Sequence, residues 1–517
     1  MNQIVVSVTS RYLWIPIDPK AEQIWVDVLC EEQLIEGFGA SISDQPAWYA
    51  AMDVSAYHGK ELTLQSKDVL PERRFLCQKA LPPGTEKEKR PSIHFTAHIG
   101  WLNDPNGLFC LDGTYHLFFQ HNPYGIRWGN MHWGHAISTD LLYWKQDSDV
   151  LSPDETGTMF SGCAIVDWEN KSGLGDGQTP PVLLYYTSDA ASYPHARTNI
   201  NGVYIAWSAD RGKTFRKLGG PSILEGLAAG DRDPKVVWVE ELQRWLMPLY
   251  KADERKCYYA VFESHDLLHW SFREEISLPG DWECPDLIPL WLNGDPAEKR
   301  WVFWGARGMY RVGRFCGEKL VLNEKVQSTL PFDGEPDYYA AQTYHLSDRP
   351  QDGTALQMQW LRHSYHGVTF NHQMSFPLKL TLKGTDGAEQ LCMQPAPEAA
   401  ASLLPKQTVK TQDILEIPDL NEHGTYLRLR LADAAFDMTI AGQDICYRDG
   451  ILATSRGEIS LLPLGGSIVL EAVVDGPVVE LFWQDGRHTV LLESLSSGLK
   501  ITFAHGGWAE AEVYGDA

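Results

Sequence analysis

The sequence predicts an all-β protein built around a five-bladed β-propeller, with a β-sandwich after it and a small β domain before it. Short apolar runs of strand length alternate with turn residues along the 517-residue chain. Five of these runs follow an acidic residue or a Phe-Ser-Gly turn, and their starts recur every 50 to 72 residues. Repeats of this length, each long enough for four strands, are typical of propeller blades. The 19 Trp and 21 Tyr residues also favour strand-rich packing.

The first unit, residues 1–88, is expected to be a small antiparallel β-sandwich that ends in a linker. Apolar runs at 12–17 and 23–29 are broken by turn residues, and residues 61–65 alternate as a half-buried strand does. Proline, glycine and the charged run 86–90 indicate the linker. We expect this unit to cover one edge of the funnel at the mouth of the central channel or to form the contact of a homodimer.

The predicted propeller spans residues 89–395. Its first blade opens with Trp101–Gly107, where Pro105 and Gly107 predict a rigid turn that aims Asp104 from the entrance of a strand. The innermost strands of all blades begin at the same end of the central channel. Residues at the five starts should therefore converge there, namely Asp104, Ser161, Asp233, Glu283 and Asp337.

Residues 396–517 are expected to form a second β-sandwich. The Pro- and Ala-rich stretch 395–401 predicts a short connecting helix. Strand-like runs follow at 426–431, 467–474 and 478–483, and Asp485-Gly486 marks a hairpin turn.

The charge and composition of the chain argue against some classes of binding partner and predict its redox state and location. The formal net charge of −24 argues against nucleic acid and anionic membrane surfaces, and no window of the sequence reaches eighteen apolar residues. The nine cysteines are odd in number and show no paired spacing, which predicts reduced thiols. With no signal-peptide pattern at the N-terminus, the sequence predicts a cytoplasmic location.

Carboxylates gathered at one mouth of a propeller repel one another, and a structural role rarely needs such an arrangement. Glycoside hydrolysis does need it, because one carboxyl group serves as nucleophile or base and another as acid. No metal or cofactor is expected, since His132 and His135 lack a third ligand and are interpreted as structural. Cys284 has no histidine close in sequence and is interpreted as a packed thiol.

Four motifs in this order resemble glycoside hydrolase family 32, the β-fructofuranosidases that include invertase, inulinase and levanase. They are W-L-N-D-P-N-G at 101–107, F-S-G at 160–162, R-D-P at 232–234 and W-E-C-P-D at 282–286. The resemblance covers about residues 90 to 395. It implies a retaining hydrolase that cleaves terminal β-D-fructofuranosyl residues from sucrose, fructo-oligosaccharides or fructans, which are small-molecule carbohydrate substrates.

The resemblance also implies a role for each matching residue. Asp104 would be the nucleophile that attacks C2 of the fructosyl unit, Glu283 the general acid/base, and Asp233 the stabiliser of the transition state. Retention implies that the Asp104 and Glu283 carboxyl groups lie about 5–5.5 Å apart. The residues implied to bind substrate are Asn103, Gln120, Trp128, Phe160, Ser161 and Arg232, with Asp337 and Tyr338 as further candidates.

This chain departs from the family pattern in the fifth blade. Members often carry Trp-Arg-Gly ahead of a Met-Ser-Leu-Pro run, whereas here the segment 363–372 precedes Met-Ser-Phe-Pro at 374–377. Because this blade helps to shape the leaving-group side of the site, the identity of the leaving group stays open. Three alternatives stay open as well. They are a fructosyltransferase that uses a sugar acceptor in place of water, a non-catalytic fructan-binding protein, and an inverting glycosidase of the arabinanase type with carboxyl groups about 6.5–9.5 Å apart.

Overall fold

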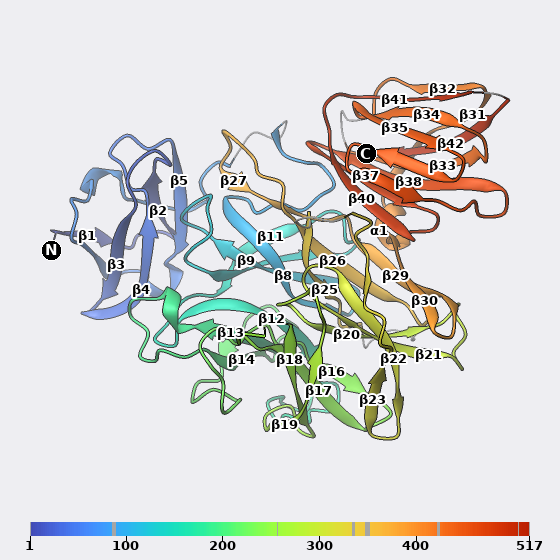
Figure 1. Cartoon of the computed structure of the whole chain (residues 1–517). Coiled ribbons are helices and arrows are strands. Elements are labelled where there is room, and N and C mark those ends of the chain that lie inside the picture. Colours follow the sequence, from blue (N-terminus) through green and yellow to red (C-terminus); the bar gives the residue numbers. More distant parts are fainter. Residues whose placement is uncertain are drawn as a thin grey trace.

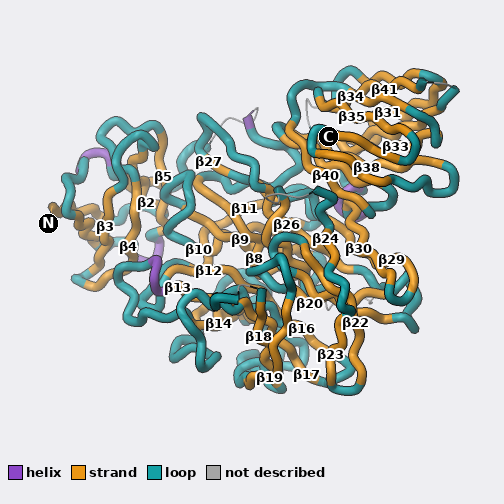
Figure 2. The backbone as a smooth tube through the Cα atoms, in the orientation of Figure 1, coloured by secondary structure: helices purple, strands orange, loops and turns teal. Residues whose placement is uncertain are grey.

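The computed structural model of the chain describes residues 2–84, 89–255, 257–332, 337–346, 352–420, 424–504 and 506–515. Within these residues the protein is all-β, with nine sheets (Figures 1 and 2). Helix α1 (Pro397–Ala400) occupies the predicted connecting stretch, and short 3-10 turns lie at Ser55–Tyr57, Glu72–Arg74 and Ala190–Ser192. Residues 85–88, which include three of the five residues of the predicted charged run 86–90, lie outside the described residues.

The N-terminal unit consists of two sheets that enclose their own core. Leu13, Ile15, Val28, Phe38 and Leu64 are among the residues buried between them. The alternating burial of the strand over residues 61–66 is the pattern that its sequence predicts. The strand order is β1 (Asn2–Ser7), β6 (Glu61–Ser66), β3 (Ile24–Cys30), β4 (Gln33–Ala40) in one sheet and β5 (Trp48–Asp53), β2 (Tyr12–Ile17), β7 (Leu76–Gln78) in the other.

Five sheets follow along the chain between residues 100 and 395. The first is ordered β11 (Lys145–Leu151), β10 (His132–Ser138), β9 (Thr114–Asn122), β8 (Gly100–Leu111), β27 (Phe370–Asn371). The second contains β12 (Thr158–Val166), β13 (Val182–Asp189), β14 (Gly202–Ser208), β15 (Arg216–Lys217), and the third β16 (Val237–Val239), β17 (Arg244–Tyr250), β18 (Tyr258–Ser264), β19 (Ser271–Ser277).

The fourth sheet contains β20 (Asp286–Trp291), β21 (Lys299–Trp304), β22 (Met309–Cys316), β23 (Lys319–Leu322), with β24 (Gln327–Ser328) beside β22. The fifth contains β25 (Tyr338–Thr343), β26 (Ala355–Leu361), β29 (Leu378–Thr385), β30 (Ala388–Pro395), with β28 (Gln373–Met374) beside β26. Strand β27, from the last of these repeats, pairs in parallel with β8 of the first sheet. The end of the repeat array is thereby joined to its beginning.

The C-terminal unit is a pair of six-stranded sheets with a separate apolar core. One sheet is ordered β31 (Leu404–Gln412), β42 (Trp508–Gly515), β33 (Thr425–Ala432), β38 (Ser467–Asp475), β39 (Val478–Trp483), β40 (His488–Glu493). The other is ordered β32 (Ile414–Ile417), β41 (Leu499–Phe503), β34 (Phe436–Ile440), β35 (Gln443–Arg448), β36 (Ile451–Thr454), β37 (Gly457–Ser460).

A buried charged cluster joins the C-terminal unit to the central sheets. The ring nitrogens of His94 lie 2.9 Å from Asp475 Oδ2 and 2.6 Å from Glu480 Oε2, and all three side chains are almost fully buried. Burial alone would lower the pKa of His94, but the two carboxylates outweigh it and raise that pKa to about 9. The ring is therefore a cation at neutral pH and pairs with both acids.

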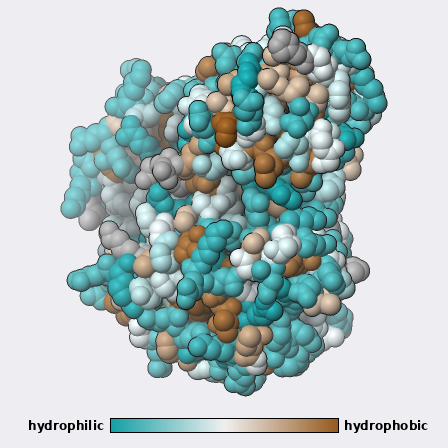
Figure 3. Space-filling model, turned by 45° about the vertical axis from the view of Figure 1, so that its right-hand side comes forward, coloured by the Kyte–Doolittle hydropathy of each residue, from teal (hydrophilic) through white to brown (hydrophobic). Residues whose placement is uncertain are grey.

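The face shown in Figure 3 is predominantly hydrophilic, with scattered hydrophobic residues. This agrees with the strongly negative net charge of the chain. In the part of the chain that the structure describes, no helix has the length and apolar character needed to cross a membrane.

Candidate active site

The structure brings Asp104, Asp233 and Glu283 together around one buried cysteine, although 179 residues separate the first from the last. The backbone N–H of Cys284 donates to Oδ2 of Asp233 over 3.1 Å. Its Sγ lies 3.7 Å from Oδ2 of Asp104 and 3.6 Å from Oδ2 of Asp233. The convergence predicted from the repeat starts is thus confirmed for these three acids.

Asp104 is aimed by a β-bulge inside β8. The register between β8 and β9 shifts between Leu102 and Pro105, so that Asp104 lies in an irregular stretch of the ladder. Bulges re-aim side chains in this way beside active sites. The sequence predicts a turn at the entrance of a strand, whereas the structure extends β8 through the whole motif. Gly107, at φ 54°, packs so closely on Phe118 that a Cβ atom there would lie 2.7 Å from its ring.

Two neighbours hold the Asp104 carboxylate by hydrogen bonds. Ser161 Oγ donates to Oδ2 over 2.5 Å, and Asn103 Nδ2 donates to Oδ1 over 3.0 Å. Burial raises the pKa of Asp104, the hydrogen bonds from Ser161 and Asn103 oppose this, and the charge of Glu283 adds to it. Ser161 lies at a bulge of its own, where the register of β12 shifts between residues 160 and 162.

Glu283 has a partner on each carboxylate oxygen. Arg232 Nη2 donates to Oε1, and the phenol of Tyr339 donates to Oε2. Arg232 Nε also lies 3.7 Å from Oδ2 of Asp233, so that one guanidinium bridges two carboxylates. A rigid guanidinium suits this task because it presents several donors in one plane.

The backbone at two of the carboxylates is in the left-handed region. Asp233 has φ 63°, Glu283 has φ 64° and the adjoining Cys284 has φ 39°. Non-glycine residues adopt such angles at a cost of about 1–3 kcal/mol each, and they cluster where function needs a fixed geometry. The N–H of Asp233 is held by Thr187 Oγ1 at 2.9 Å.

The close carboxylates change one another's proton affinity. Burial raises the pKa of Asp233 to about 7, Arg232 opposes this, and the charges of Glu283 and Asp104 add to it. One low-dielectric site holding three carboxyl groups and one arginine favours retention of a proton within the cluster. A site that keeps both a proton and a carboxylate can perform acid/base and nucleophilic steps together.

The predicted sugar-binding side chains lie around this cluster. Trp128 is 53% exposed and meets Phe160 edge to face, with ring centroids 5.9 Å apart. Gln120 is buried, and among the described residues its Nε2 has no hydrogen-bond partner. Asn103 is oriented by Trp101, whose Nε1 donates to its Oδ1 over 2.8 Å. An open aromatic face and an unpartnered amide N–H group suit a ligand with hydroxyl groups and an apolar side.

Two predicted residues do not reach the cluster. Asp337 forms an ion pair with Arg456 of the C-terminal unit, with Oδ2 and Nη2 2.7 Å apart. Tyr338 is buried, and its hydroxyl lies 3.1 Å from Oε1 of Glu480, also in that unit. Both side chains thus contact the C-terminal unit, and substrate contact by these two residues stays a prediction. Tyr339, which sequence reasoning missed, is the residue of this segment that contacts Glu283.

The histidines interpreted as structural are in fact paired inside the fold. His132 Nε2 lies 3.0 Å from Glu36 Oε1, and His135 Nε2 lies 3.0 Å from His116 Nδ1. Within the described part of the chain, no group of three or more His, Cys, Asp or Glu side chains is placed to hold a metal ion.

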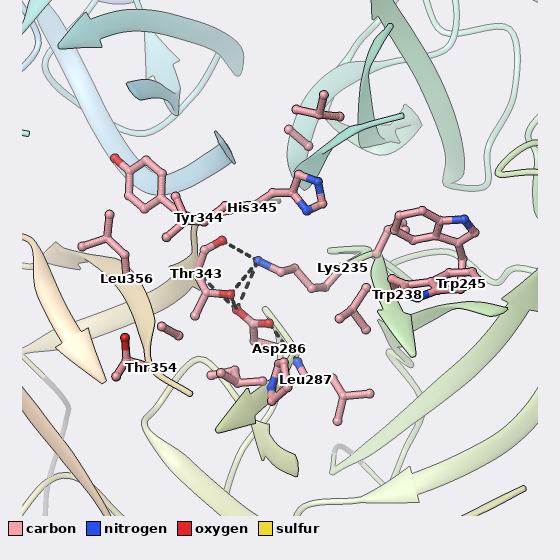
Figure 4. Close-up of a pocket in the computed structure, with 18 of the residues that line it drawn as sticks. Lys235, Trp238, Trp245, Asp286, Leu287, Thr343, Tyr344, His345, Thr354 and Leu356 are labelled. Carbon is pink, nitrogen blue, oxygen red and sulfur yellow. Dashed lines mark hydrogen bonds and ion pairs between the residues drawn. The ribbon is translucent and has the colours of Figure 1, made fainter. Parts of the chain in front are cut away.

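A cavity of about 520 Å³ lies farther along the same strands (Figure 4). Lys235 Nζ donates to the carbonyl of Thr343 over 2.7 Å and lies 3.2 Å from Asp286 Oδ2. None of the predicted site residues lines this cavity. The cavity is therefore a separate feature from the carboxylate cluster, and Lys235, two residues after Asp233, ties the third, fourth and fifth sheets together.

The chain is similar to known proteins in sequence and in fold. Residues 94–395 match the model of the glycosyl hydrolases family 32 N-terminal domain. A levanase from Bacillus subtilis (strain 168) is 31% identical over 483 residues, which are 82% of this chain and 69% of the levanase. An extracellular exo-inulinase from Aspergillus awamori is 33% identical over 368 residues, which are 62% of this chain and 67% of the inulinase.

A solved structure shares the fold at lower sequence identity. The β-fructofuranosidase from Schwanniomyces occidentalis complexed with fructosyl-erythritol superposes with a TM-score of 0.71 at 21% identity, covering 84% of this chain and 98% of that one. The matching family model covers more than half of the chain and includes all three carboxylates. The chain belongs to glycoside hydrolase family 32.

Proposed function

We propose that this protein is a retaining β-fructofuranosidase that releases terminal fructose from sucrose or from fructo-oligosaccharides and fructans. The observation that carries the proposal is the arrangement of Asp104 and Glu283 in one cluster, with two donors on each carboxyl group. Its relatives are named levanase and exo-inulinase, so hydrolysis is favoured over transfer to a sugar acceptor. The protein is accordingly a glycoside hydrolase of the β-fructofuranosidase type.

The first chemical step is the displacement of the leaving sugar. A carboxylate oxygen of Asp104 attacks C2 of the fructosyl unit, and the bond from C2 to the glycosidic oxygen breaks. The proton of Glu283 passes to that oxygen, which leaves as a hydroxyl group. The product of this step is an ester between Asp104 and fructose, with Glu283 left as a carboxylate.

The second step reverses the roles. Glu283 takes a proton from water, the water oxygen attacks C2, and the ester bond breaks to restore the carboxylate of Asp104. Two inversions at C2 give net retention. In both steps Asp233, bridged to Glu283 through Arg232, faces the positive charge that develops on the sugar ring.

The five central sheets are proposed to be the five blades of a propeller. This rests on the order of the sheets, on the parallel pairing of β27 with β8, and on convergence of residues from all five at one site. The carboxyl separation of about 5–5.5 Å is part of the proposal, because retention requires it.

A homodimer stays a prediction, as does the cytoplasmic location. Nine free cysteines support that location, although the Aspergillus relative is named extracellular.

The proposal is tested by measuring fructose release from sucrose, inulin-type and levan-type oligosaccharides. The unaltered protein should act on at least one of them, and Asp104→Ala should lose activity by about 10⁴-fold or more, because the covalent step then lacks its nucleophile. Asp176→Ala, at an exposed loop position, is the matched control and should keep full activity. Unchanged activity of Asp104→Ala would refute the assignment.

A further inference from the structure

The segment that carries Trp128 is a loop that is held both by the central sheets and by the N-terminal unit. This Trp128 loop, residues 123–131, connects β9 to β10. Trp128 is more than half exposed, and its ring contact is with Phe160. An exposed side chain with so little packing cannot fix its own position. The backbone that carries it must be held by other groups.

The N-terminal unit supplies several of those groups through β4, an edge strand of its sheet, in addition to Asn371 of β27, whose Nδ2 donates to the carbonyl of Ile126 over 3.1 Å. Glu36 is 7% exposed, and its Oε1 contacts Tyr124 near the beginning of the loop and His132, the residue that directly follows it. The hydroxyl of Tyr124 donates to this oxygen over 2.6 Å, and His132 Nε2 lies 3.0 Å away. A single buried carboxylate oxygen thus ties the beginning of the loop to the residue that follows its end. Figure 1 shows the N-terminal unit beside these strands of the central domain.

The C-terminal end of β4 binds the side chain of Asn130 in the loop. The N–H of Gly39 donates to Oδ1 of Asn130 over 2.9 Å, and Nδ2 of Asn130 donates to the carbonyl of Gly39 over 2.8 Å. Phe38, fully buried, stacks on Tyr124 with ring centroids 4.2 Å apart. The edge of β4 that has no partner strand in its own sheet is thereby hydrogen-bonded to the central domain.

A relay of hydrogen bonds runs from this contact to the residue before Trp128. Nδ2 of Asn130 also donates to Oδ1 of Asn122 over 3.0 Å. Nδ2 of Asn122 donates in turn to the carbonyl of Arg127 over 2.8 Å. Each amide uses both its donor and its acceptor, so that a shift of Gly39 is transmitted to the backbone at Arg127. Chains of such bonds reinforce one another in a buried setting.

We infer that the N-terminal β domain holds Trp128 in place at the sugar-binding side of the active site, and that Glu36 is the positioning residue of this contact. The inference rests on the proposed function for the identity of the ligand, a terminal fructosyl unit. It goes beyond that function because it gives the N-terminal domain a part in substrate binding. Glu36 touches no reacting group, so its loss should affect KM and leave the chemical step intact.

The test compares Glu36→Ala and the near-isosteric Glu36→Gln with Glu61→Ala, an exposed glutamate of the same domain. Glu36→Ala should raise KM for the substrate found active by about tenfold, with kcat changed less than about threefold, since tenfold corresponds to about 1.4 kcal/mol. Glu36→Gln should fall between this variant and the unaltered protein, because its amide oxygen still accepts from Tyr124. Glu61→Ala should leave both constants unchanged.

A double-mutant cycle separates positioning of Trp128 from a general effect on folding. In a Trp128→Ala background, Glu36→Ala should raise KM no further, because the side chain that it positions is absent. An equal rise of KM in both backgrounds would overturn the inference. So would an unchanged KM for Glu36→Ala.

A second readout needs no activity and distinguishes failure of this inference from failure of the proposed function. Trypsin cleaves after arginine, and Arg127 is exposed but held in the loop. Glu36→Ala should be cut after Arg127 about tenfold faster than the unaltered protein or Glu61→Ala, because the loop opens more often. Equal cleavage rates in all three proteins would show that Glu36 does not hold the loop, whatever the substrate is.

Discussion

Tyr339 donates a hydrogen bond to Oε2 of Glu283, placing a phenol of the fifth sheet against the carboxyl group that precedes the fourth. The neighbouring Tyr338 points to Glu480 in the C-terminal unit instead. Two adjacent tyrosines therefore serve two different sites. This difference makes them a matched pair for mutagenesis.

Tyr339→Phe should lower kcat by about tenfold or more, because a hydrogen bond to a charged group contributes about 1.5–3 kcal/mol. Substrate binding should change little, since the phenol donates to Glu283, the proposed acid/base. Tyr338→Phe is the control and should lower the melting temperature without lowering kcat. Steady-state kinetics and thermal unfolding of both variants check this, and equal kcat values for the two would contradict it.

Asp233→Asn should abolish activity and yet stabilise the folded protein at neutral and alkaline pH. Burial raises the pKa of Asp233 from 3.8 to about 7, so the folded state disfavours its ionised form. Folding stability is therefore lost as pH rises from the lower to the higher value. The asparagine removes this loss, which is worth up to about 4 kcal/mol above pH 7. Thermal unfolding across this range should show the gain growing with pH, and a gain that is the same at all pH values would refute the interpretation.

His94→Gln should destabilise the protein most below neutral pH. The pKa of His94 is about 9 in the folded protein and 6.5 in the unfolded chain, so its charge stabilises the fold fully below 6.5. That stabilisation, about 3 kcal/mol, is lost as pH rises through 9. The difference in unfolding free energy between the two proteins should accordingly shrink at alkaline pH. If it grew instead, the ring would be neutral in the folded state.

Cys284 should resist alkylation although it touches two of the carboxylates. Burial, together with the charges of Asp233 and Asp104, raises its pKa well above the ordinary value, and the thiolate is the reactive form. Iodoacetamide at neutral pH should modify the exposed Cys316 first and leave activity intact. Peptide mass spectrometry locates the label. Rapid loss of activity with label on Cys284 would show that this thiol is accessible and ionised.

The convergence of the three carboxylates could be predicted from the sequence because each precedes an apolar run and has a proline close by, which gives the repeat a local signal. The choice between Tyr338 and Tyr339 could not. In a regular strand adjacent side chains point to opposite faces, and β25 is irregular between residues 339 and 342, where Ala340 has φ 52°. A bulge of this kind depends on packing against β26 and leaves no mark in the sequence.

The role of β4 in holding the Trp128 loop could not be predicted from the sequence either. Glu36 is separated from His132 by 96 residues, and nothing in the Glu-Gly-Phe-Gly stretch distinguishes it from an ordinary strand end. The sequence predicts only that the N-terminal unit covers one edge of the funnel or forms a dimer contact. Its packing against the Trp128 loop emerges from tertiary contacts alone.

The configuration of a product formed in methanol–water tests the central claim most directly. If fructose is first held as an ester on Asp104, methanol can replace water in the second step, and sucrose should yield methyl β-D-fructofuranoside. Proton and carbon NMR of the fresh product identify the anomer, and Asp104→Ala should form none. The account predicts the β anomer, because two inversions restore the starting configuration. The α anomer would contradict it and would indicate a single displacement between carboxyl groups set farther apart.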